Sequence, residues 1–270
     1  MRLGPERLPT FVVIGAMKSG TTSMARALRA HPEVFLAKVK EVRFFTRHYD
    51  LGTDWYRAHF AGADGAVAVG EATPSYLADP AVPARMADDI PEARLVAMLR
   101  NPVDRAYSHY WMNRALGGEK RGFSDAVEAE SRGEGSPYLG MGRYREQLER
   151  FSSRFGRDRL LVLVFEDFAR DPGPPFSEVC RFVGIDDRPR PRELHERANR
   201  YVTFRSLRGR RLAKRLPGVL GKVAGRLVTR KRSSYPPMEE AFRRTLIERI
   251  EDQISALEAW LDADLSIWRR

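Results

Sequence analysis

The sequence has very little cysteine, and several familiar patterns are missing from it. Cys180 is the single cysteine among 270 residues, which excludes an internal disulfide, and its place in an apolar helix pattern predicts a buried structural thiol. No Cys-x-x-Cys or His-x-x-x-His pair is present, so we expect no metal site. No apolar run is long enough to span a membrane, and residues 1–5 lack the apolar region of a signal peptide. We therefore expect a cytoplasmic protein.

What the chain does have is a regular alternation of strand and helix patterns. This alternation predicts an α/β fold with a central parallel sheet flanked by helices. Residues 160–165 are apolar on both faces, which is typical of a central parallel strand. Because no linker or internal repeat interrupts the pattern, we expect one domain over residues 1–270. The expected strands are residues 11–15, 66–69, 94–99 and 160–165, and the expected helices are residues 22–30, 103–116, 142–155 and 176–183.

A strand, a turn rich in anion donors and a helix follow one another from residue 11 onwards. The turn holds Lys18, Gly20 and four hydroxyl residues. Backbone N–H groups at a helix N-terminus bind phosphate or sulfate, and glycine allows a close approach. This is a phosphate-binding strand–loop–helix of the kind found in P-loop kinases, but Lys18 precedes Gly20 and the Walker A spacing is absent, which points away from ordinary ATP or GTP hydrolysis. The alternative is a plain βα turn with a solvated lysine.

A second basic position lies at the end of the expected strand 94–99. Arg100 follows this strand, and Ser108 lies in the helix pattern after it. Ligands bind at this edge of open α/β sheets, and arginine can grip a phosphate through two parallel N–H bonds. The alternative is an arginine that only ties down the turn.

Together these segments resemble the sulfotransferases that use PAPS (3′-phosphoadenosine 5′-phosphosulfate). The K-S-G-T-T loop at 18–22 resembles the family's 5′-phosphosulfate loop, and R-N-P-V-D-R-A-Y-S-H-Y-W at 100–111 resembles its 3′-phosphate motif. Other segments resemble the glycan-type branch, which contains the heparan sulfate sulfotransferases and bacterial relatives. These are residues 40–45 (K-E-V-R-F-F), 54–60, 70–77 (G-E-A-T-P-S-Y-L) and 230–238 (R-K-R-S-S-Y-P-P-M).

The resemblance implies how the donor PAPS, whose product is PAP, would be held without a metal. PAPS has two anionic ends and needs two basic sites. Lys18 would stabilise the leaving phosphate, while Arg100 and Ser108 would hold the 3′-phosphate that ATP lacks. A loop at 230–233 would close over the nucleotide ahead of a C-terminal helix at about 239–262. The implied donor-binding residues are Lys18, Ser19, Gly20, Thr21, Thr22, Ser23, Arg100, Ser108, Arg230, Lys231, Arg232 and Ser233.

The acceptor needs a base, and the resemblance assigns that role to Glu41. A carboxylate near cations stays ionised and still accepts a proton in the transition state. The alternative is a glutamate that only pairs with Lys40 or Arg43. His48 and His59 remain candidates for the base, and Glu71 is another because it follows an expected strand.

The acceptor itself stays open at this stage. Ala72 stands where glycan-type members often carry lysine, which argues against a heparan-like acceptor. A small molecule, a natural product, or a free or carrier-bound saccharide would each fit, with a hydroxyl favoured over an amine. The stretch 117–138 is a candidate gate for the acceptor. The candidate acceptor-binding residues are Lys40, Phe45, His48, Trp55, Glu71 and Tyr76.

The positive charge is concentrated in one segment. Residues 205–232 contain eleven Lys or Arg residues and no acid, in a chain of net charge +11. Apolar residues recur there at helical spacing, so we expect a basic helical lid at about 200–235. Its basic face is either solvated, a dock for an anionic acceptor, or a contact for a membrane surface. Nucleic acid is not an expected partner, because no nucleic-acid-binding signature accompanies the charge.

Two functions of other classes compete with the sulfotransferase hypothesis. A kinase-like phosphoryl transferase would use the same loop with a magnesium-binding acid, for which Asp167 is the candidate. A non-catalytic polyanion-binding protein would depend on residues 205–232 and would not need Lys18 or Glu41.

Overall fold

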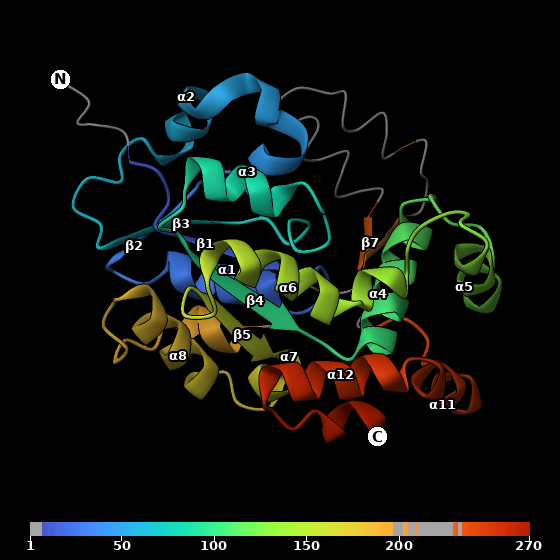
Figure 1. The fold of residues 1–270 in the computed structure, drawn as a ribbon. Coiled ribbons are helices and arrows are strands. Elements are labelled where there is room, and N and C mark those ends of the chain that lie inside the picture. Colours follow the sequence, from blue (N-terminus) through green and yellow to red (C-terminus); the bar gives the residue numbers. More distant parts are fainter. Residues whose placement is uncertain (1–6, 197–201, 205–208, 210–228, 232–233) are drawn as a thin grey trace. The chain divides into compact units, whose positions relative to one another are not determined.

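The computed structural model describes residues 7–196, 202–204, 209, 229–231 and 234–270, which fall into two compact units (Figure 1). The first unit comprises Met1–Asn101, Arg143–Ala198 and Asp252–Arg270, and the second comprises Pro102–Gly142 and Asn199–Glu251. Among the described residues, no helix is both long and apolar enough to cross a bilayer.

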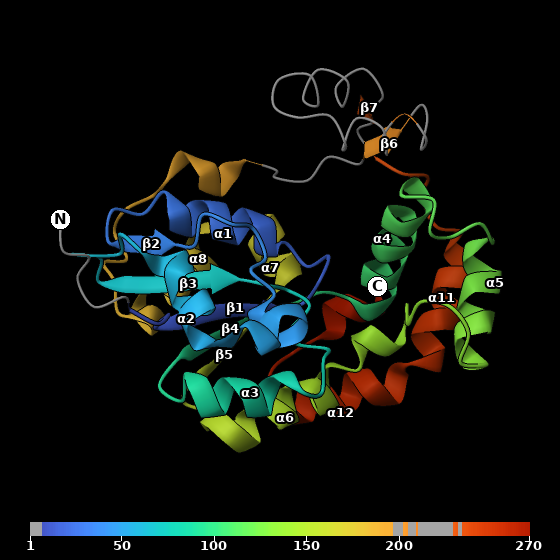
Figure 2. The same ribbon diagram turned by 90° about the horizontal axis from the view of Figure 1, so that it is seen from above.

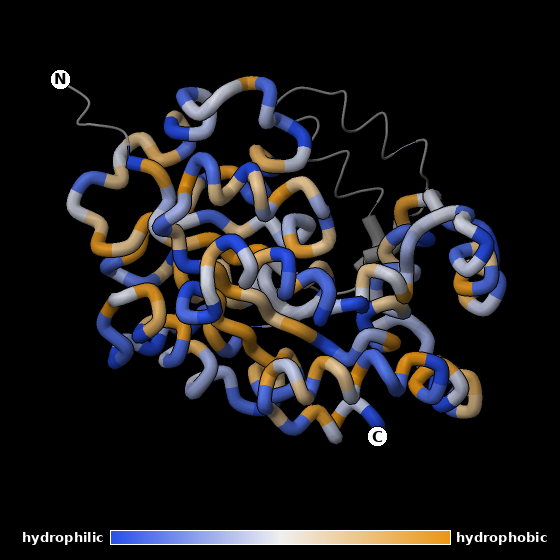
Figure 3. Tube along the Cα trace, viewed as in Figure 1, coloured by the Kyte–Doolittle hydropathy of each residue, from blue (hydrophilic) through white to orange (hydrophobic). Residues whose placement is uncertain are grey.

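A five-stranded parallel sheet forms the centre of the first unit. Its order is β2-β3-β1-β4-β5. Every residue of β1 is buried, as are all residues of β4 after its first. Figure 3 shows hydrophobic residues gathered along these strands, as a sheet covered on both faces requires. The strands are β1 (Phe11–Gly15), β2 (Val34–Leu36), β3 (Ala68–Ala72), β4 (Arg94–Leu99) and β5 (Leu160–Val164).

Helices cover both faces of this sheet (Figure 2). Helices α1 (Thr21–Arg29), α7 (Phe165–Arg170) and α8 (Gly173–Val183) cover one face, where Met24, Phe168 and Phe176 pack against the strands. Helices α3 (Val82–Asp89) and α6 (Tyr144–Phe155) cover the other. The remaining helices of this unit are η1 (Phe44–His48), η2 (Tyr49–Leu51), α2 (Gly52–Arg57), η3 (Ala58–Phe60), η5 (Arg192–His195), α12 (Glu251–Leu261) and η6 (Ser266–Arg269).

The second unit contains two longer helices linked by an ion pair. Arg243 of α11 (Glu240–Arg249) donates through Nε and Nη2 to the Asp104 carboxylate of α4 (Pro102–Ala115), at 3.0 and 3.2 Å. Phe123 of α5 (Phe123–Ser131) meets Phe242 of α11 with ring centroids 6.0 Å apart. The unit also holds η4 (Gly140–Gly142) and the antiparallel pair β6 (Val202–Phe204) and β7 (Thr229–Lys231).

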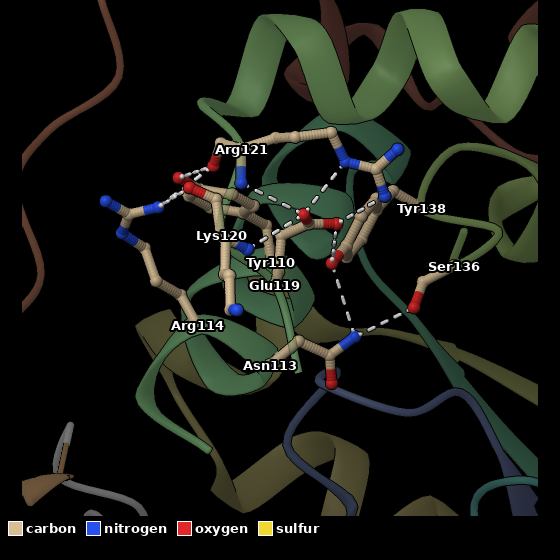
Figure 4. A network of polar contacts seen from close by, with 8 residues as sticks. All are labelled: Tyr110, Asn113, Arg114, Glu119, Lys120, Arg121, Ser136 and Tyr138. Atoms are coloured by element: carbon tan, nitrogen blue, oxygen red, sulfur yellow. Dashed lines mark hydrogen bonds and ion pairs between the residues drawn. The ribbon is translucent and has the colours of Figure 1, made fainter. Parts of the chain in front are cut away.

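A buried carboxylate organises the stretch between α4 and η4 (Figure 4). Glu119 accepts from the backbone N–H groups of Lys120 and Arg121, from the Arg121 guanidinium and from the Tyr138 hydroxyl. The hydrogen bond from the Arg121 side chain is the largest cause that lowers the pKa of Glu119, to about 2. Asn113 connects Tyr138 to Ser136. The described part of this stretch is therefore ordered around Glu119.

The expected α/β fold, the parallel sheet and the flanking helices are confirmed, and four details differ. Strand β5 lies at an edge of the described sheet, not at its centre, and its apolar character reflects helices packed on both of its faces. Strand β3 is shifted toward Ala72, and the short strand β2 was not expected. The single C-terminal helix expected at 239–262 is two helices, α11 and α12, because the helix ends at Ile250. Cys180 is buried, and burial raises the pKa of its thiol to about 11.

Candidate functional site

Three segments that carry predicted site residues meet at one edge of the sheet in the first unit. Strands β3, β1 and β4 are neighbours and parallel, so their carboxyl ends lie side by side. The loop after β1 carries Lys18, the end of β3 carries Glu71, and Arg100 directly follows β4. This edge is where an open α/β sheet binds its ligand.

The loop after β1 has an unusual backbone that brings it close to a neighbouring ring. Lys18 and Gly20 both lie in the left-handed region, at φ 76° and 81°. A Cβ at Gly20 would lie 2.7 Å from the ring of Phe165, so only glycine fits there. The backbone then enters α1, whose amide groups begin at Thr21. The predicted strand–loop–helix is therefore present.

Arg100 joins this loop directly. Its Nη1 donates to the carbonyl oxygen of Lys18 at 3.3 Å, and its guanidinium lies over the Phe165 ring at 5.1 Å. One hydrogen bond thus joins Arg100 to the backbone of the loop that carries Lys18, and the Phe165 ring lies beside both Arg100 and Gly20 of that loop.

One hydroxyl group in the loop suits an anion. Ser19 is fully buried, and its Oγ has no hydrogen-bond partner among the described residues. A buried hydroxyl without a partner is costly, and a phosphate or sulfate oxygen would satisfy it. Thr21 is also buried, whereas Thr22 and Ser23 are partly exposed. The donor set of this loop therefore fits an anionic group.

The residues behind Arg100 fasten its backbone. The Tyr144 hydroxyl donates to the Arg100 carbonyl at 3.0 Å. Glu166 accepts from the backbone N–H of Asn101 at 3.0 Å and from the indole N–H of Trp268 at 2.9 Å. The Asn101 side chain returns a bond to the Trp268 carbonyl at 2.6 Å. The C-terminal end of the chain thus fixes the position directly after Arg100.

Glu41 lies in a short segment with a strained backbone. Both Glu41 and Arg43 have φ near 58°, which non-glycine residues rarely adopt. Arg43 donates to the Glu41 carboxylate through Nε at 3.2 Å and through Nη2, and Lys40 lies 3.9 Å from the other oxygen. The side chain remains 25% exposed. The Glu41 carboxylate is therefore paired with Arg43 and still accessible to a substrate. The ion pair considered as an alternative to a catalytic role is present, and it leaves that role open to Glu41.

Glu71 was expected to be accessible to the acceptor, but its side chain is buried. It is 1% exposed, and its carboxylate accepts from the hydroxyls of Tyr56, Thr73 and Tyr76 at 2.8, 2.6 and 3.0 Å. It also accepts a backbone bond from Val42. Burial raises the pKa of Glu71, and these hydrogen bonds oppose the rise. This burial argues against Glu71 as a base that contacts the acceptor.

The other candidate acceptor residues divide by exposure. Phe45 and Tyr76 are fully buried, so any part they play is indirect. Lys40 is largely exposed, and His48 and Trp55 are partly exposed, with their rings 5.0 Å apart. The ring centroids of His59 and Trp55 are 4.5 Å apart. Burial lowers the pKa of His59, and the charge of the nearby His48 lowers it further.

Several residues predicted to bind the donor PAPS lie outside the first unit. Ser108 lies on α4 in the second unit, and Arg230 and Lys231 lie in β7. Arg232, Ser233 and almost all of the basic segment 205–232 lie outside the described residues. Their assignments stay predictions. Beside them, Tyr107 of α4 donates to the carbonyl groups of Pro236 and Pro237, which fastens the chain after this loop to α4.

Sequence reasoning missed Phe165, Thr73 and Tyr56. The sequence pattern places Phe165 at the end of an expected strand and indicates no further role for it, although site residues gather at the carboxyl ends of strands. Thr73 lies within the quoted G-E-A-T-P segment but was given no role. Nothing in the sequence links Tyr56 to Glu71, because fifteen residues separate them.

The acid expected by a kinase-like mechanism is not arranged for that task. Asp167 is half exposed and pairs with Arg170 on the same helix, and Glu166 is occupied by Asn101 and Trp268. In the part of the chain that the structure describes, no three His, Cys, Asp or Glu side chains gather where they could hold a metal ion.

Comparison with known proteins places the chain in a family. The family described as sulfotransferase domain matches residues 8–253. The human bifunctional heparan sulfate N-deacetylase/N-sulfotransferase 3 is 29% identical over 98% of this chain but only 31% of its own length. The human heparan sulfate glucosamine 3-O-sulfotransferase 3B1 is 29% identical over 88% of this chain and 63% of its own length. The chain thus spans less than two thirds of either relative.

A solved structure agrees over the whole length. The crystal structure of a sulfotransferase from Alicyclobacillus acidocaldarius superposes with a TM-score of 0.77 at 29% identity, covering 98% of this chain and all of that one. With the family match over residues 8–253, this agreement shows that the chain belongs to the sulfotransferase domain family.

Proposed function

We propose that this chain transfers a sulfuryl group from PAPS to a hydroxyl or amine of a saccharide or other small acceptor. The observation that carries the proposal is the hydrogen bond from Arg100 to the backbone carbonyl of Lys18, which joins Arg100 to the phosphate-binding loop at the ligand-binding edge of the sheet. A donor with two anionic ends needs two basic sites. The unpartnered Ser19 hydroxyl and the glycine-dependent loop support the same proposal.

In this proposal each residue has one task. The acceptor oxygen or nitrogen gives its proton to the Glu41 carboxylate as it forms a bond to sulfur, and the bond from sulfur to the phosphate oxygen breaks. Lys18 stabilises the charge that collects on the departing phosphate. Arg43 orients Glu41, because its guanidinium donates to the Glu41 carboxylate. Arg100 binds the 3′-phosphate and distinguishes the donor from ATP.

The acceptor class is supported by similarity alone. The two human relatives are named for action on heparan sulfate, one as an N-sulfotransferase and one as a 3-O-sulfotransferase. A saccharide acceptor is the class that these names favour. Ala72, where lysine is common in the glycan-type branch, favours a saccharide other than heparan sulfate itself.

Calorimetric titration with PAP, ATP and ADP tests the donor. We expect PAP to bind more tightly than either nucleotide, and we expect Lys18→Ala and Arg100→Ala to weaken PAP binding. Arg94→Ala is the matched control, since Arg94 is an exposed arginine at the opposite end of the same strand as Arg100. Equal affinity for PAP and ATP in the wild type would contradict the proposal.

A second set of measurements separates the competing functions. Sulfuryl transfer from PAPS that persists in EDTA and fails in Glu41→Gln would support the proposal. A strict requirement for Mg²⁺ with ATP as the donor would favour a kinase-like enzyme instead. If Lys18→Ala and Glu41→Gln change nothing while loss of residues 205–232 abolishes heparin binding, the chain is a polyanion-binding protein.

A further inference from the structure

The buried carboxylate of Glu71 takes no part in the proposed chemistry, and its surroundings call for an explanation. A buried charge is costly unless several donors satisfy it. Three hydroxyl groups and one backbone N–H surround Glu71, which matches the four hydrogen bonds that a carboxylate readily accepts. The chain therefore retains a buried charge within two residues of the end of a strand at the candidate site.

Two of the hydroxyl groups that donate to Glu71 also accept hydrogen bonds from backbone amides of residues 42–45. The backbone N–H of Val42 bonds to Glu71 directly. The N–H of Arg43 donates to the Thr73 hydroxyl at 3.3 Å, and the N–H of Phe45 donates to the Tyr76 hydroxyl at 3.4 Å. Three of the four backbone amides after Glu41 are thus linked to the Glu71 carboxylate, either directly or through one hydroxyl group.

The charge of Glu71 sets the direction of these bonds. A hydroxyl has one hydrogen, so Thr73 and Tyr76, each giving that hydrogen to Glu71, present only lone pairs to the amides of Arg43 and Phe45. A neutral amide at position 71 could donate to a hydroxyl oxygen and turn its hydrogen toward the loop. A carboxylate at position 71, which only accepts hydrogen bonds, therefore makes both hydroxyls acceptors for the loop amides.

We propose that Glu71 is a positioning residue for Glu41: through Thr73 and Tyr76 it holds residues 42–45, and so keeps Glu41 and Arg43 in their left-handed backbone conformation. That conformation is unfavourable for residues with a side chain, so it requires support from the surrounding structure. Tyr56 of α2 donates the remaining hydrogen bond to Glu71 and so helps to fix the position of its carboxylate. The inference rests on the proposed role of Glu41 as the base.

Four variants test the inference. Thr73→Val keeps the shape of the side chain and removes the hydroxyl, while Thr73→Ser keeps the hydroxyl and removes a methyl group. Glu71→Gln removes the charge with little change in shape. Thr10→Val is the matched control, because the Thr10 hydroxyl bonds to Val69 at the other end of β3, away from residues 42–45.

Each variant is measured in three ways. Amide hydrogen exchange reports on Val42, Arg43 and Phe45. Calorimetry gives the PAP dissociation constant. PAP release from PAPS is followed with a chitosan oligosaccharide, a saccharide other than heparan sulfate that offers both hydroxyl and amine groups, and gives kcat and KM.

We expect Thr73→Val and Glu71→Gln to lose protection at the loop amides and to lower kcat by about 10- to 100-fold, because a small misplacement of a catalytic group has that effect. Their affinity for PAP should stay close to that of the wild type. Thr73→Ser should recover most of kcat, and Thr10→Val should resemble the wild type in all three measurements.

The inference is overturned if Thr73→Ser is impaired more than Thr73→Val, since that order indicates packing and not the hydroxyl. Unchanged exchange at Val42 and Arg43 in both Glu71→Gln and Thr73→Val would also overturn it. A wild type that fails to bind PAP overturns the proposed function instead, and the exchange result then still decides whether Glu71 holds residues 42–45.

Discussion

The guanidinium of Arg100 donates a hydrogen bond to the backbone carbonyl of Lys18 over 3.3 Å. The two residues follow different strands of the sheet, β1 and β4, and lie 82 positions apart in the chain. Because β1 and β4 are parallel neighbours, the bond fixes the phosphate loop to the residue that ends the next strand. A movement of either residue therefore changes the site for both ends of the proposed donor.

Replacement of Arg100 by lysine keeps the charge and removes the planar fork of donors. Lysine neither binds a phosphate through two parallel bonds nor stacks on the Phe165 ring as arginine does. We expect the PAP dissociation constant to rise roughly 10-fold, equivalent to about 1.4 kcal/mol. Calorimetry of Arg100→Lys beside Arg94→Lys checks this, and equal affinity of the two variants would contradict the role given to Arg100.

Gly20→Ala should both destabilise the chain and weaken PAP binding. The new Cβ would meet the Phe165 ring at 2.7 Å in a left-handed backbone. Gly62→Ala is the matched control, with a similar φ of 88° and no atom within 4 Å of the new Cβ. We expect the control to cost about 1 kcal/mol from the backbone alone, and Gly20→Ala to cost more. Urea denaturation gives the two free energies of unfolding, and similar values would show that Phe165 yields to the new group.

Glu166→Gln and Asp167→Asn each remove one of two neighbouring charges, and we expect only Glu166→Gln to lower stability and PAP affinity. Glu166 holds both Asn101 and Trp268, so its amide variant leaves one of these donors without an acceptor and should cost about 1–3 kcal/mol. It should also weaken PAP binding, because Asn101 directly follows Arg100. Asp167→Asn should change neither property, since Asp167 is a half-exposed residue paired only within its own helix. If Asp167→Asn abolishes turnover while stability is unchanged, the kinase-like reading gains support.

The stability of the second unit should depend on acid pH through Glu119. The pKa of Glu119 in the folded chain is about 2, below its ordinary value of 4.5, because Arg121 and two backbone amides bond to the charged form. The ionised carboxylate therefore contributes stability that is complete above pH 4.5 and is lost as the pH falls through about 2.

Urea denaturation of the wild type, Glu119→Gln and Glu128→Gln between pH 7 and pH 2 measures this dependence. The difference between the wild type and Glu119→Gln should shrink toward acid pH. Glu128 is an exposed glutamate on α5, so its variant should follow the wild type throughout. A difference for Glu119→Gln that stays constant with pH would indicate a packing effect and not the charge.

Local patterns in the sequence are enough to predict the fold class and the main elements of the sheet edge. Strands β1 and β4 were predicted with their observed bounds, because short apolar runs that a turn follows directly are distinctive. The phosphate loop was evident because glycine, lysine and hydroxyl residues follow a strand at short spacing. These are local patterns, so the chain order alone reveals them.

Other positions depend on contacts between segments far apart in the chain, and these became visible only in the folded structure. The place of β5 at the edge of the described sheet depends on strand pairing, which its apolar sequence does not encode. Phe165 meets Gly20 and Arg100 because β5 pairs with β4, and Tyr56 reaches Glu71 because α2 folds over the end of β3. The burial of Glu71 follows from the same contacts. Hydrogen bonds and burial of this kind arise from the packing of segments far apart in the chain, so no local pattern could have predicted that Glu71 is buried among three hydroxyl groups.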